Sequence, residues 1–384
     1  MTLVLALGLA LLACGALEAG LHRRNLERIP VRVLVNGTRG KSSVTRLVAG
    51  ALRESGCPTV AKTTGSAARI ILEDGSELPL ARPFGARITE QKALARLAAR
   101  RGARALVVEC MAVRPESQEV MQSQLVRATL GLITNARVDH VEEMGPSLEE
   151  TLAALAGTVP RGGTLVTAEP RLAEPAYARR ARRVVLAEAA SVGPELLASF
   201  PYPVFAENLA LALAAAEELG IERETALRGM AKARPDLGAL GLWRLELPSG
   251  PAYVVNAFAA NDLASTALAW EEAARRLPAG LPVFLLYNGR ADREYRLAEF
   301  LELPARIPGL AAVAAAGQYA RKAARAFARR GYPTLDLEPG AGCEAILASL
   351  AARAGGGFVL FGAGNFQGLG RELAERCERE GSIL

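Results

Sequence analysis

The fold of this chain is decided by residues 31–47, which read Val-Arg-Val-Leu-Val-Asn-Gly-Thr-Arg-Gly-Lys-Ser-Ser-Val-Thr-Arg-Leu. A short run rich in β-branched residues is followed by a glycine turn and then by apolar residues at helical spacing, which predicts strand, loop and helix. In a phosphate-binding P-loop the backbone N–H groups and the helix N-terminus face the anion, the lysine reaches the terminal phosphates, and the serine hydroxyl binds Mg²⁺. The stretch therefore predicts a nucleotide phosphate site, made by Asn36, Gly37, Thr38, Arg39, Gly40, Lys41, Ser42 and Ser43.

The loop departs from the standard P-loop pattern at one position. That pattern has a glycine five residues before the second glycine, where this chain has Val35, and the loop carries Gly37 instead. A glycine turn with an exposed lysine is therefore the alternative interpretation. The strand before the loop and the helix after it favour the phosphate site.

Composition favours a two-domain protein of a reducing compartment. The chain has 384 residues, of which 51% are hydrophobic, enough for two cores of ordinary size. Its net charge of +6 comes mostly from scattered arginines, and few aromatic residues interleave with them, so nucleic-acid binding is not expected. Five cysteines are an odd number, and the absence of a CxxC pair supports neither a disulfide framework nor a zinc site.

Residues 2–17 are almost entirely Leu, Ala, Val and Gly, and Glu18 is the first charged residue. This run is slightly shorter than the roughly 20 apolar residues that normally cross a bilayer. No basic residues precede it, which argues against a cleaved signal peptide. Because Arg23 and Arg24 follow, the positive-inside rule predicts an anchor in the cell membrane with the rest of the chain in the cytoplasm. The alternative is a helix that packs on a partner subunit within the membrane.

After residue 29, short apolar strands alternate with helical segments. Predicted strands at residues 59–62, 105–108 and 128–134 indicate a parallel sheet covered by helices on both faces. Ligands of such sheets bind beyond the carboxyl ends of the strands. The residues at predicted strand ends are Asn36, Thr63, Glu109 and Asn135. We expect them to form one composite site.

Glu109 lies where a metal-binding acid is expected, at the end of a buried strand. A carboxylate suits Mg²⁺, which takes one or two acids together with phosphate oxygens and water, and an ordinary loop acid is the alternative. Cys110 is predicted to be a small buried residue, because no neighbour in sequence offers a base to activate it. Asp139 and His140 add polar groups that can orient phosphate or metal, although His140 taken alone fits a structural histidine.

The helical pattern breaks near residues 235–238, where we place a domain boundary. The predicted domains are an anchor and basic flank at 1–28, a P-loop domain at 29–237, and a Rossmann-like α/β domain at 238–384. In the last of these, strands are expected near residues 252–256, 282–287, 310–315 and 358–361. Asn208 opens a long alanine-rich helix, and the pattern leaves open whether it lies near the N-cap or faces the nucleotide.

Three features together resemble the Mur ligase superfamily of ATP-dependent amide ligases: the loop from Gly37 to Ser43, the strand-end Glu109, and the group Asn135, Asp139 and His140. Longer motifs narrow the resemblance to the poly-γ-glutamate synthase ligases of capsule biosynthesis. They are Lys-Thr-Thr-Gly-Ser-Ala-Ala-Arg at 62–69, Glu-Cys-Met-Ala-Val at 109–113, Asp-His-Val-Glu-Glu-Met-Gly-Pro at 139–146, Asn-Ala-Phe-Ala-Ala-Asn-Asp at 256–262, and Asn-Gly-Arg-Ala-Asp-Arg at 288–293. The resemblance implies a Mur-type P-loop ATPase domain, then a smaller Rossmann-like domain, after an N-terminal hydrophobic helix.

The resemblance implies that the protein is an acid–amino-acid ligase using ATP and Mg²⁺. The γ-phosphoryl group would pass to a carboxylate of the growing chain, giving an acyl phosphate and ADP. The amine of glutamate would then attack, extending poly-γ-glutamate and releasing phosphate. The implied partners are glutamate, the poly-γ-glutamate chain, the membrane and membrane-embedded subunits of a polymer synthase, with a homo-oligomer as a further expectation and no nucleic acid.

The same resemblance assigns roles to individual residues. Its catalytic residues are Lys41, Glu109, His140, Asp262 and Arg290, and its metal ligands are Ser42, Glu109 and His140. Its substrate-side residues are Thr63, Thr64, Arg69 and Asn261, and its nucleotide-side residues beyond the loop are Asn135 and Asn208, the latter at the adenine. Arg290 is chosen because a guanidinium group binds a carboxylate through two parallel hydrogen bonds.

Several other functions compete with this interpretation, among them another ligase of the Mur type. A folylpolyglutamate-like synthase is one, and a regulatory P-loop ATPase subunit of a membrane polymer-export complex is another. A P-loop GTPase should carry an Asn-Lys-x-Asp motif, which this sequence lacks. A small-molecule P-loop kinase would leave the second α/β domain unexplained.

Overall fold

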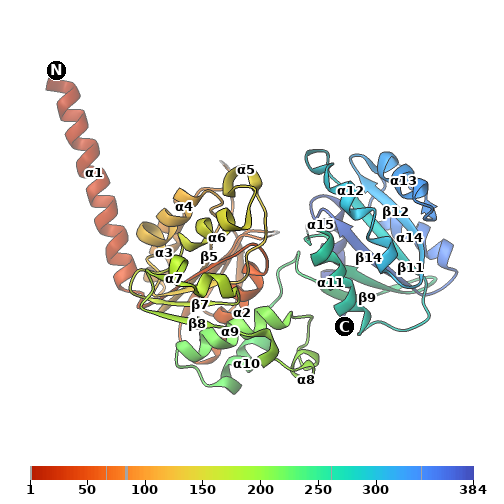
Figure 1. Ribbon diagram of the computed structural model, residues 1–384, viewed down its shortest axis with the longest axis horizontal. Coiled ribbons are helices and arrows are strands. Elements are labelled where there is room, and N and C mark those ends of the chain that lie inside the picture. The colour runs from red at the N-terminus through yellow and green to blue at the C-terminus, as the bar shows by residue number, and fades with distance from the viewer. Residues whose placement is uncertain (1, 66, 83–84, 261, 339) are drawn as a thin grey trace. The chain divides into compact units, whose positions relative to one another are not determined.

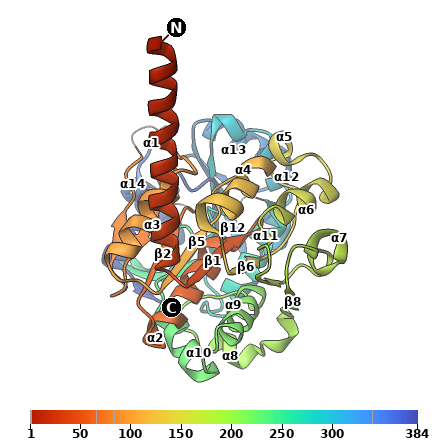
Figure 2. The ribbon, with the colours of Figure 1, turned by 90° about the vertical axis from the view of Figure 1, so that its left-hand side faces the viewer.

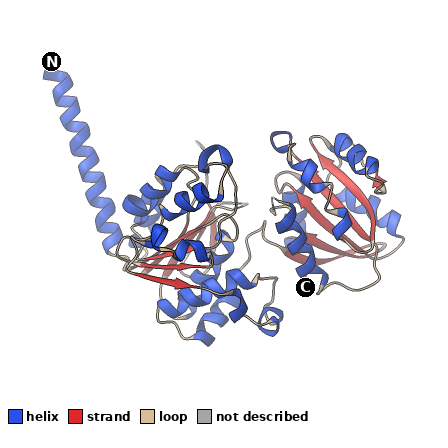
Figure 3. Cartoon of the chain, viewed as in Figure 1, coloured by secondary structure: helices blue, strands red, loops and turns tan. Residues whose placement is uncertain are grey.

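The computed structural model describes residues 2–65, 67–82, 85–260, 262–338 and 340–384. The chain divides into two compact units, each built on its own sheet (Figures 1 and 3). The first unit comprises Met1–Pro194 and Phe205–Arg234, and the second comprises Glu195–Val204 and Pro235–Leu384. Predicted α/β architecture is confirmed in both units.

Helix α1 (Thr2–Glu27) precedes the first sheet and is the only helix in the described part of the chain that is long and apolar enough to cross a bilayer. Its first turns extend beyond the rest of the first unit (Figure 2), and leucines such as Leu3 and Leu11 are more than 70% exposed. By contrast, His22 and Leu26 near its C-terminal end are buried. The apolar run is therefore continuous with a segment that belongs to the folded core.

The first sheet has eight strands in the order β4-β3-β2-β5-β1-β6-β7-β8. The parallel strands are β1 (Val31–Asn36), β2 (Thr59–Thr63), β5 (Ala105–Glu109), β6 (Leu130–Ile133), β7 (Thr164–Thr167) and β8 (Arg183–Leu186). The short antiparallel strands β3 (Arg69–Ile71) and β4 (Glu77–Pro79) extend one edge. Since β1 lies between β5 and β6, three carboxyl ends, those of β1, β5 and β6, meet at the phosphate loop.

Helices connect and cover these strands. They are α2 (Lys41–Glu54), α3 (Glu90–Arg100), α4 (Pro115–Val120), α5 (Val141–Met144), α6 (Leu148–Ala156), α7 (Pro175–Ala178), α9 (Ala206–Glu218) and α10 (Arg223–Ala231), with 3₁₀ turns at Pro170–Ala173 and Ala189–Ser191. Helix α8 (Pro194–Ala198) belongs, except for Pro194, to the second unit. Helix α4 begins at Pro115, because proline suits the first helical turn. It continues as a π-helix, Met121–Val126, which ends at Arg127 with φ 48°.

The second sheet has seven strands in the order β13-β12-β11-β14-β10-β9-β15. They are β9 (Gly241–Leu247), β10 (Gly250–Asn256), β11 (Val283–Gly289), β12 (Leu310–Gly317), β13 (Thr334–Leu335), β14 (Phe358–Gly364) and β15 (Ser382–Ile383). The accompanying helices are α11 (Leu263–Ala274), α12 (Arg296–Phe300), α13 (Ala320–Arg329), α14 (Cys343–Ala354) and α15 (Leu369–Glu380), with 3₁₀ turns at Ala291–Arg293 and Pro304–Arg306. All four strands expected here are present, whereas the antiparallel β9 and β15 and the short β13 were not anticipated.

Candidate active site

The loop between β1 and α2 is held in a conformation that favours glycine. Gly37 has φ +124° and Gly40 has φ +83°, where L side chains are strained. A Cβ atom on Gly37 would lie 2.0 Å from the Thr134 hydroxyl, and one on Gly40 would lie 2.3 Å from the Asn208 side-chain oxygen. The loop is thus packed closely against the residue after β6 and against α9.

Helix α2 starts with Gly40 at its N-cap, and no described side chain caps it. Its first hydrogen bond in the helical pattern runs from the Val44 N–H to the Gly40 carbonyl at 2.9 Å. The N–H groups of Lys41, Ser42 and Ser43 at the helix start are those that an α-helix leaves unpaired within itself. Such groups, together with the positive end of the helix dipole, are suited to bind phosphate.

The Lys41 amine folds back over the loop. Its Nζ donates to the Gly37 carbonyl at 2.6 Å and to the Thr38 carbonyl at 3.3 Å. Burial lowers the pKa of Lys41, while the Glu109 carboxylate works in the opposite direction. An ammonium held by two neutral carbonyls gains strongly from an anion, so this side chain is ready to bind the terminal phosphates.

Asn135 clamps the loop from the end of β6. Its side-chain oxygen accepts from the Thr38 hydroxyl at 2.7 Å and from the Arg39 N–H at 3.1 Å. Its amide nitrogen donates to the Arg39 carbonyl at 3.2 Å, and the Thr134 hydroxyl donates to the same carbonyl at 2.6 Å. Both polar ends of Asn135 are thereby used to shape the loop.

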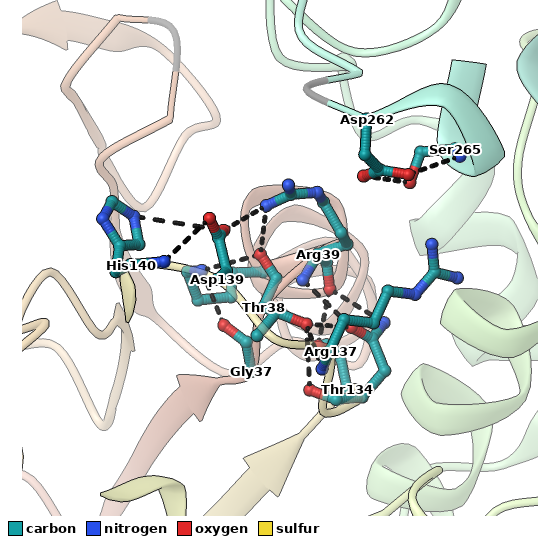
Figure 4. A network of polar contacts seen from close by, with 11 residues as sticks. Gly37, Thr38, Arg39, Thr134, Arg137, Asp139, His140, Asp262 and Ser265 are labelled. Atoms are coloured by element: carbon teal, nitrogen blue, oxygen red, sulfur yellow. Dashed lines mark hydrogen bonds and ion pairs between the residues drawn. The ribbon is translucent and has the colours of Figure 1, made fainter. Parts of the chain in front are cut away.

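Asp139 lies between His140 and Arg39 (Figure 4). Its Oδ2 is 2.7 Å from the Arg39 Nη1 and 4.0 Å from the His140 Nε2. Burial opposes ionisation, but the Arg39 guanidinium outweighs it and holds the pKa of Asp139 below its ordinary range. His140 has φ +50° at the start of α5 and a partly exposed side chain. Within the described residues it contacts Asp139 and makes no hydrogen bond to Ser42 or Glu109.

Glu109, at the end of β5, links the start of α2 to the residue that follows β2. Its Oε2 accepts from the Ser42 hydroxyl at 2.8 Å and from the Thr64 N–H at 2.6 Å. The residue is only 3% exposed. Beside it, the buried Thr63 hydroxyl has no hydrogen-bond partner among the described residues. Three of the predicted residues, Ser42, Thr64 and Glu109, are thus in direct contact.

This oxygen set fits a hard divalent cation. Mg²⁺ is commonly held by one or two protein oxygens, with the remaining positions taken by phosphate oxygens and water. Ser42 and Glu109 supply such a pair next to the uncapped helix start. In the described part of the chain, no group of three or more His, Cys, Asp or Glu residues is arranged to hold a metal by itself. That pattern suits an ion that arrives with a nucleotide.

Two predicted nucleotide residues occupy different positions. The Asn36 amide nitrogen donates to the Gln118 side chain at 2.7 Å and to the Thr158 hydroxyl at 3.1 Å, so its two hydrogens brace the end of β1. Asn208 is buried inside α9, whose N-cap is Phe205, and its side chain lies against Gly40. Asn208 therefore lies in the first turn of α9, near the N-cap as one interpretation expected, although it is not itself the capping residue.

Other residues of the first unit were missed or underestimated from sequence. Lys62 is 1% exposed, and its Nζ lies 2.8 Å from Glu90, which also binds Arg82 at 2.9 Å. A lysine inside an otherwise apolar strand was the available signal. Arg69 lies in β3 opposite Thr63, as the antiparallel register requires. Gln118 and Thr134, which support the loop, gave no signal of their own.

Cys110 agrees with its prediction as a buried residue. It is 2% exposed, and burial raises the pKa of its thiol to about 11. At neutral pH it is therefore protonated and a poor nucleophile.

In the second unit, the predicted site residues Asp262 and Arg290 form hydrogen bonds with residues close to them in sequence. Asp262 caps α11, accepting from the Ser265 N–H and hydroxyl, each at 2.8 Å (Figure 4). Arg290 binds Asp292 through two hydrogen bonds, at 3.0 and 2.7 Å. Asn261, predicted on the substrate side, lies outside the described residues. Gly364, the last residue of β14, packs closely against β11, since a Cβ atom there would lie 2.5 Å from the Asn288 carbonyl.

The fold and the phosphate loop define the class of protein as a Mur-type ligase. Residues 35–162 match the Mur ligase middle domain. Escherichia coli FolC in complex with DHPP and ADP has a similar fold, with a TM-score of 0.67 at 16% identity, covering 94% of this chain and 92% of that one. MurF from Acinetobacter baumannii gives a TM-score of 0.62 at 17% identity, covering 95% and 80%. At these identities the likeness concerns the fold alone.

Sequence similarity narrows the class. Residues 244–380 match the poly-γ-glutamate synthase CapB C-terminal domain. PGA synthase CapB of Bacillus subtilis (strain 168) is 42% identical over 297 residues, covering 76% of this chain and 75% of that protein. The capsule biosynthesis protein CapB of Bacillus anthracis is 41% identical over 295 residues, covering 76% and 64%. The chain belongs to the CapB family of poly-γ-glutamate synthases.

Family membership confirms the predicted resemblance and the predicted class of enzyme, an ATP-dependent amide-forming ligase. The folylpolyglutamate-like alternative is not favoured, because the FolC structures share the fold at 16% identity, against 42% for CapB.

Proposed function

We propose that this chain joins glutamate units into poly-γ-glutamate, activating a chain-end carboxylate as an acyl phosphate at the expense of ATP. The observation that carries the proposal is the contact between Ser42 and Glu109 beside the uncapped start of α2, in a chain 42% identical to PGA synthase CapB. No covalent protein nucleophile is required. Catalysis would rest on positioning and on neutralising charge, as is usual in phosphoryl transfer.

In this proposal the first unit binds ATP. The N–H groups at the start of α2 bind the phosphates, and the Lys41 amine leaves the Gly37 carbonyl to contact the terminal ones. Ser42 and Glu109 would hold Mg²⁺, which when bound neutralises charge on the phosphates. Asn135 keeps the loop in shape, and Asn208 is proposed to lie near the adenine. His140 is retained as a proposed metal ligand. The ion pair between Arg39 and Asp139 would keep the backbone of His140 beside the phosphate loop.

The substrate side is proposed to involve Thr63, Thr64 and Arg69 from the first unit, and Asn261, Asp262 and Arg290 from the second. Thr63 offers a buried hydroxyl with no described partner at the strand end. Arg290 already holds a carboxylate, that of Asp292, in the two-bond geometry that a glutamate carboxylate would use. A glutamate that binds there has to displace Asp292.

The proposed domains are residues 1–28 as a membrane anchor with a basic flank, 29–237 as the ATP-binding domain, and 238–384 as the ligase domain. We propose that α1 holds the chain at the cytoplasmic side of the cell membrane, where polymer-synthase subunits embedded in the membrane are its partners. The support is the exposed apolar surface of α1 followed by Arg23 and Arg24. Self-association into a homo-oligomer is a further proposal.

The test is to incubate the full chain with ATP, Mg²⁺ and glutamate and to follow ADP release together with γ-linked polymer. We expect ADP release that depends on glutamate and a product resistant to peptidases that cleave α-linkages. Aspartate and a folate substrate serve as acceptor controls. Glutamate-independent ATP hydrolysis without polymer would support a regulatory ATPase, and folate-dependent turnover would support the folylpolyglutamate alternative.

A further inference from the structure

The C-terminal end of α1 is fixed to the first unit and does not act as a loose tether. The Glu18 carboxylate lies 2.9 Å from the Lys92 amine on α3, and the His22 Nε2 lies 3.0 Å from the Leu125 carbonyl. One turn later, Leu26 is 2% exposed within the same core as Leu94 and Leu125. The chain then reaches β1 within a few residues.

Among the residues that the structure describes, the N-terminal end of the same helix has no such partners. Within the described residues, the apolar window of α1 has none of its residues buried. At 1.5 Å per residue, the apolar residues 2–17 extend over about 24 Å, slightly less than the roughly 30 Å hydrocarbon core of a bilayer. Glu18 directly follows this run and then lies at the membrane surface, in the headgroup region.

Because Glu18 contacts Lys92, the start of α3 lies at the same height along α1 as Glu18. Arg96, one turn further along α3, is exposed and close enough to Glu18 to interact with it electrostatically. Arg23 and Arg24 on α1 are also exposed. The acidic groups facing this cluster are Glu18, paired with Lys92, and Glu27, paired with Arg23 at 3.3 Å.

We infer that this basic face, made of Arg23, Arg24, Lys92 and Arg96, binds the anionic headgroups of the membrane into which α1 inserts. The inference rests on the proposed membrane anchoring. Basic side chains are attracted to an anionic leaflet only within about a Debye length, roughly 8–10 Å. A rigid helix that enters the membrane next to α3 keeps these four residues within that range, so the ATP-binding unit lies on the surface in a fixed orientation.

The rate at which Lys92 is acetylated can report on its contact with headgroups, because the chain has few lysines. They are Lys41, Lys62, Lys92, Lys232 and Lys322. Lys92, Lys232 and Lys322 are each paired with a glutamate at the surface, namely Glu18, Glu54 and Glu294. Lys232 and Lys322 therefore serve as internal controls for the acetylation rate of Lys92. The full chain is placed in detergent, in neutral phosphatidylcholine nanodiscs, and in nanodiscs that also contain phosphatidylglycerol, and acetylation is followed by mass spectrometry.

We expect acetylation of Lys92, relative to the two controls, to slow by at least about fivefold in the anionic discs, the factor that one basic residue near an anionic surface represents. Arg96→Gln should reduce this protection, whereas Arg353→Gln, at an exposed position on α14, should not. Raising the salt concentration should also reduce it.

Three outcomes would overturn the inference. The first is equal Lys92 reactivity in all media, the second is equal protection in neutral and anionic discs, and the third is protection indifferent to Arg96→Gln. Co-elution of the chain with the discs reports the anchoring separately. A chain that does not co-elute contradicts the proposed anchor, whereas one that co-elutes with an unprotected Lys92 contradicts only the headgroup contact.

Discussion

The Lys41 amine donates its hydrogen bonds to two neutral backbone carbonyls. Removing this amine should therefore have little effect on the fold. We expect Lys41→Met to lower ligase turnover by at least roughly 10²–10³-fold, since removal of one charge-stabilising donor has that effect in other enzymes. The free energy of unfolding should change by less than about 1 kcal/mol. ADP release and thermal unfolding measure the two effects.

The control for this variant is Lys232→Met, which removes an exposed lysine paired with Glu54. It should leave turnover unchanged. Normal turnover by a well-folded Lys41→Met protein would show that the phosphate site lies elsewhere.

Glu109 is the acid that contacts the serine of the phosphate loop. Glu109→Gln keeps an oxygen that can accept from the Thr64 N–H but removes the negative charge. We expect the Mg²⁺ concentration needed for half-maximal turnover to rise about tenfold or more, because a neutral amide is a weaker ligand for a hard cation. Glu116→Gln, at an exposed position on α4, is the matched control. An unchanged Mg²⁺ requirement would remove Glu109 from the metal site.

Cys110, Cys343 and Cys377 are buried, and their thiols have raised pKa values. Burial raises the pKa of Cys110 and of Cys343 to about 11, and that of Cys377 to about 12. The reactive thiolate forms only as the pH approaches the pKa, so at pH 8 roughly 0.1% or less of each is ionised. Iodoacetamide at pH 8 should therefore modify the partly exposed Cys57 and spare these three until the chain unfolds. Mass spectrometry of the peptides checks this, and early labelling of Cys110 would contradict its burial.

At the scale of elements, the phosphate loop depends on close contact between two helices that are far apart in sequence. Gly40 opens α2, and its missing side chain leaves room for Asn208 of α9. We expect Gly40→Ala to abolish ATP binding and to destabilise the first unit by about 1–3 kcal/mol, from backbone strain and overpacking. ADP titration and chemical unfolding measure the two effects.

Gly56→Ala separates these two causes. Gly56 has a similar positive φ of +79°, but no atom of the described part of the chain lies within 4 Å of the Cβ that alanine would add. It should therefore lose about 1–2 kcal/mol from strain and still bind ADP normally. If both variants bound the nucleotide equally well, the contact between Gly40 and Asn208 would be irrelevant to the site.

At the scale of the whole molecule, α1 has two parts with different roles. Deletion of residues 2–17 removes exposed side chains only, so the stability of the remaining chain should not change, while its association with lipid should be lost. Deletion of residues 2–27 also removes Leu26 from the core and should cost about 2–3 kcal/mol or more in unfolding free energy. Unfolding in denaturant and nanodisc binding distinguish the two. Equal stability of both deletions would contradict the docking of His22 and Leu26.

Local patterns in the sequence were sufficient for the alternation of strands and helices, the phosphate loop and the strand-end position of Glu109. Each depends on residues close in the chain: Val31 to Val35 form a strand, Gly37 and Gly40 a turn, and Lys41 opens a helix. Parallel strands place their carboxyl ends at one edge, so the meeting of Ser42 with Glu109 also followed from the pattern.

Tertiary structure alone decided which polar residues are free and which are already occupied. Asn36 is used by Gln118 and Thr158, Asp262 by Ser265, and Arg290 by Asp292. It also placed Asn208 against Gly40 and the end of α1 against α3. The physical reason is that a hydrogen bond or a close contact depends on positions in space. Partners far apart in the chain, such as Gly40 and Asn208 at a separation of 168 residues (208 − 40), leave no periodic trace in the sequence.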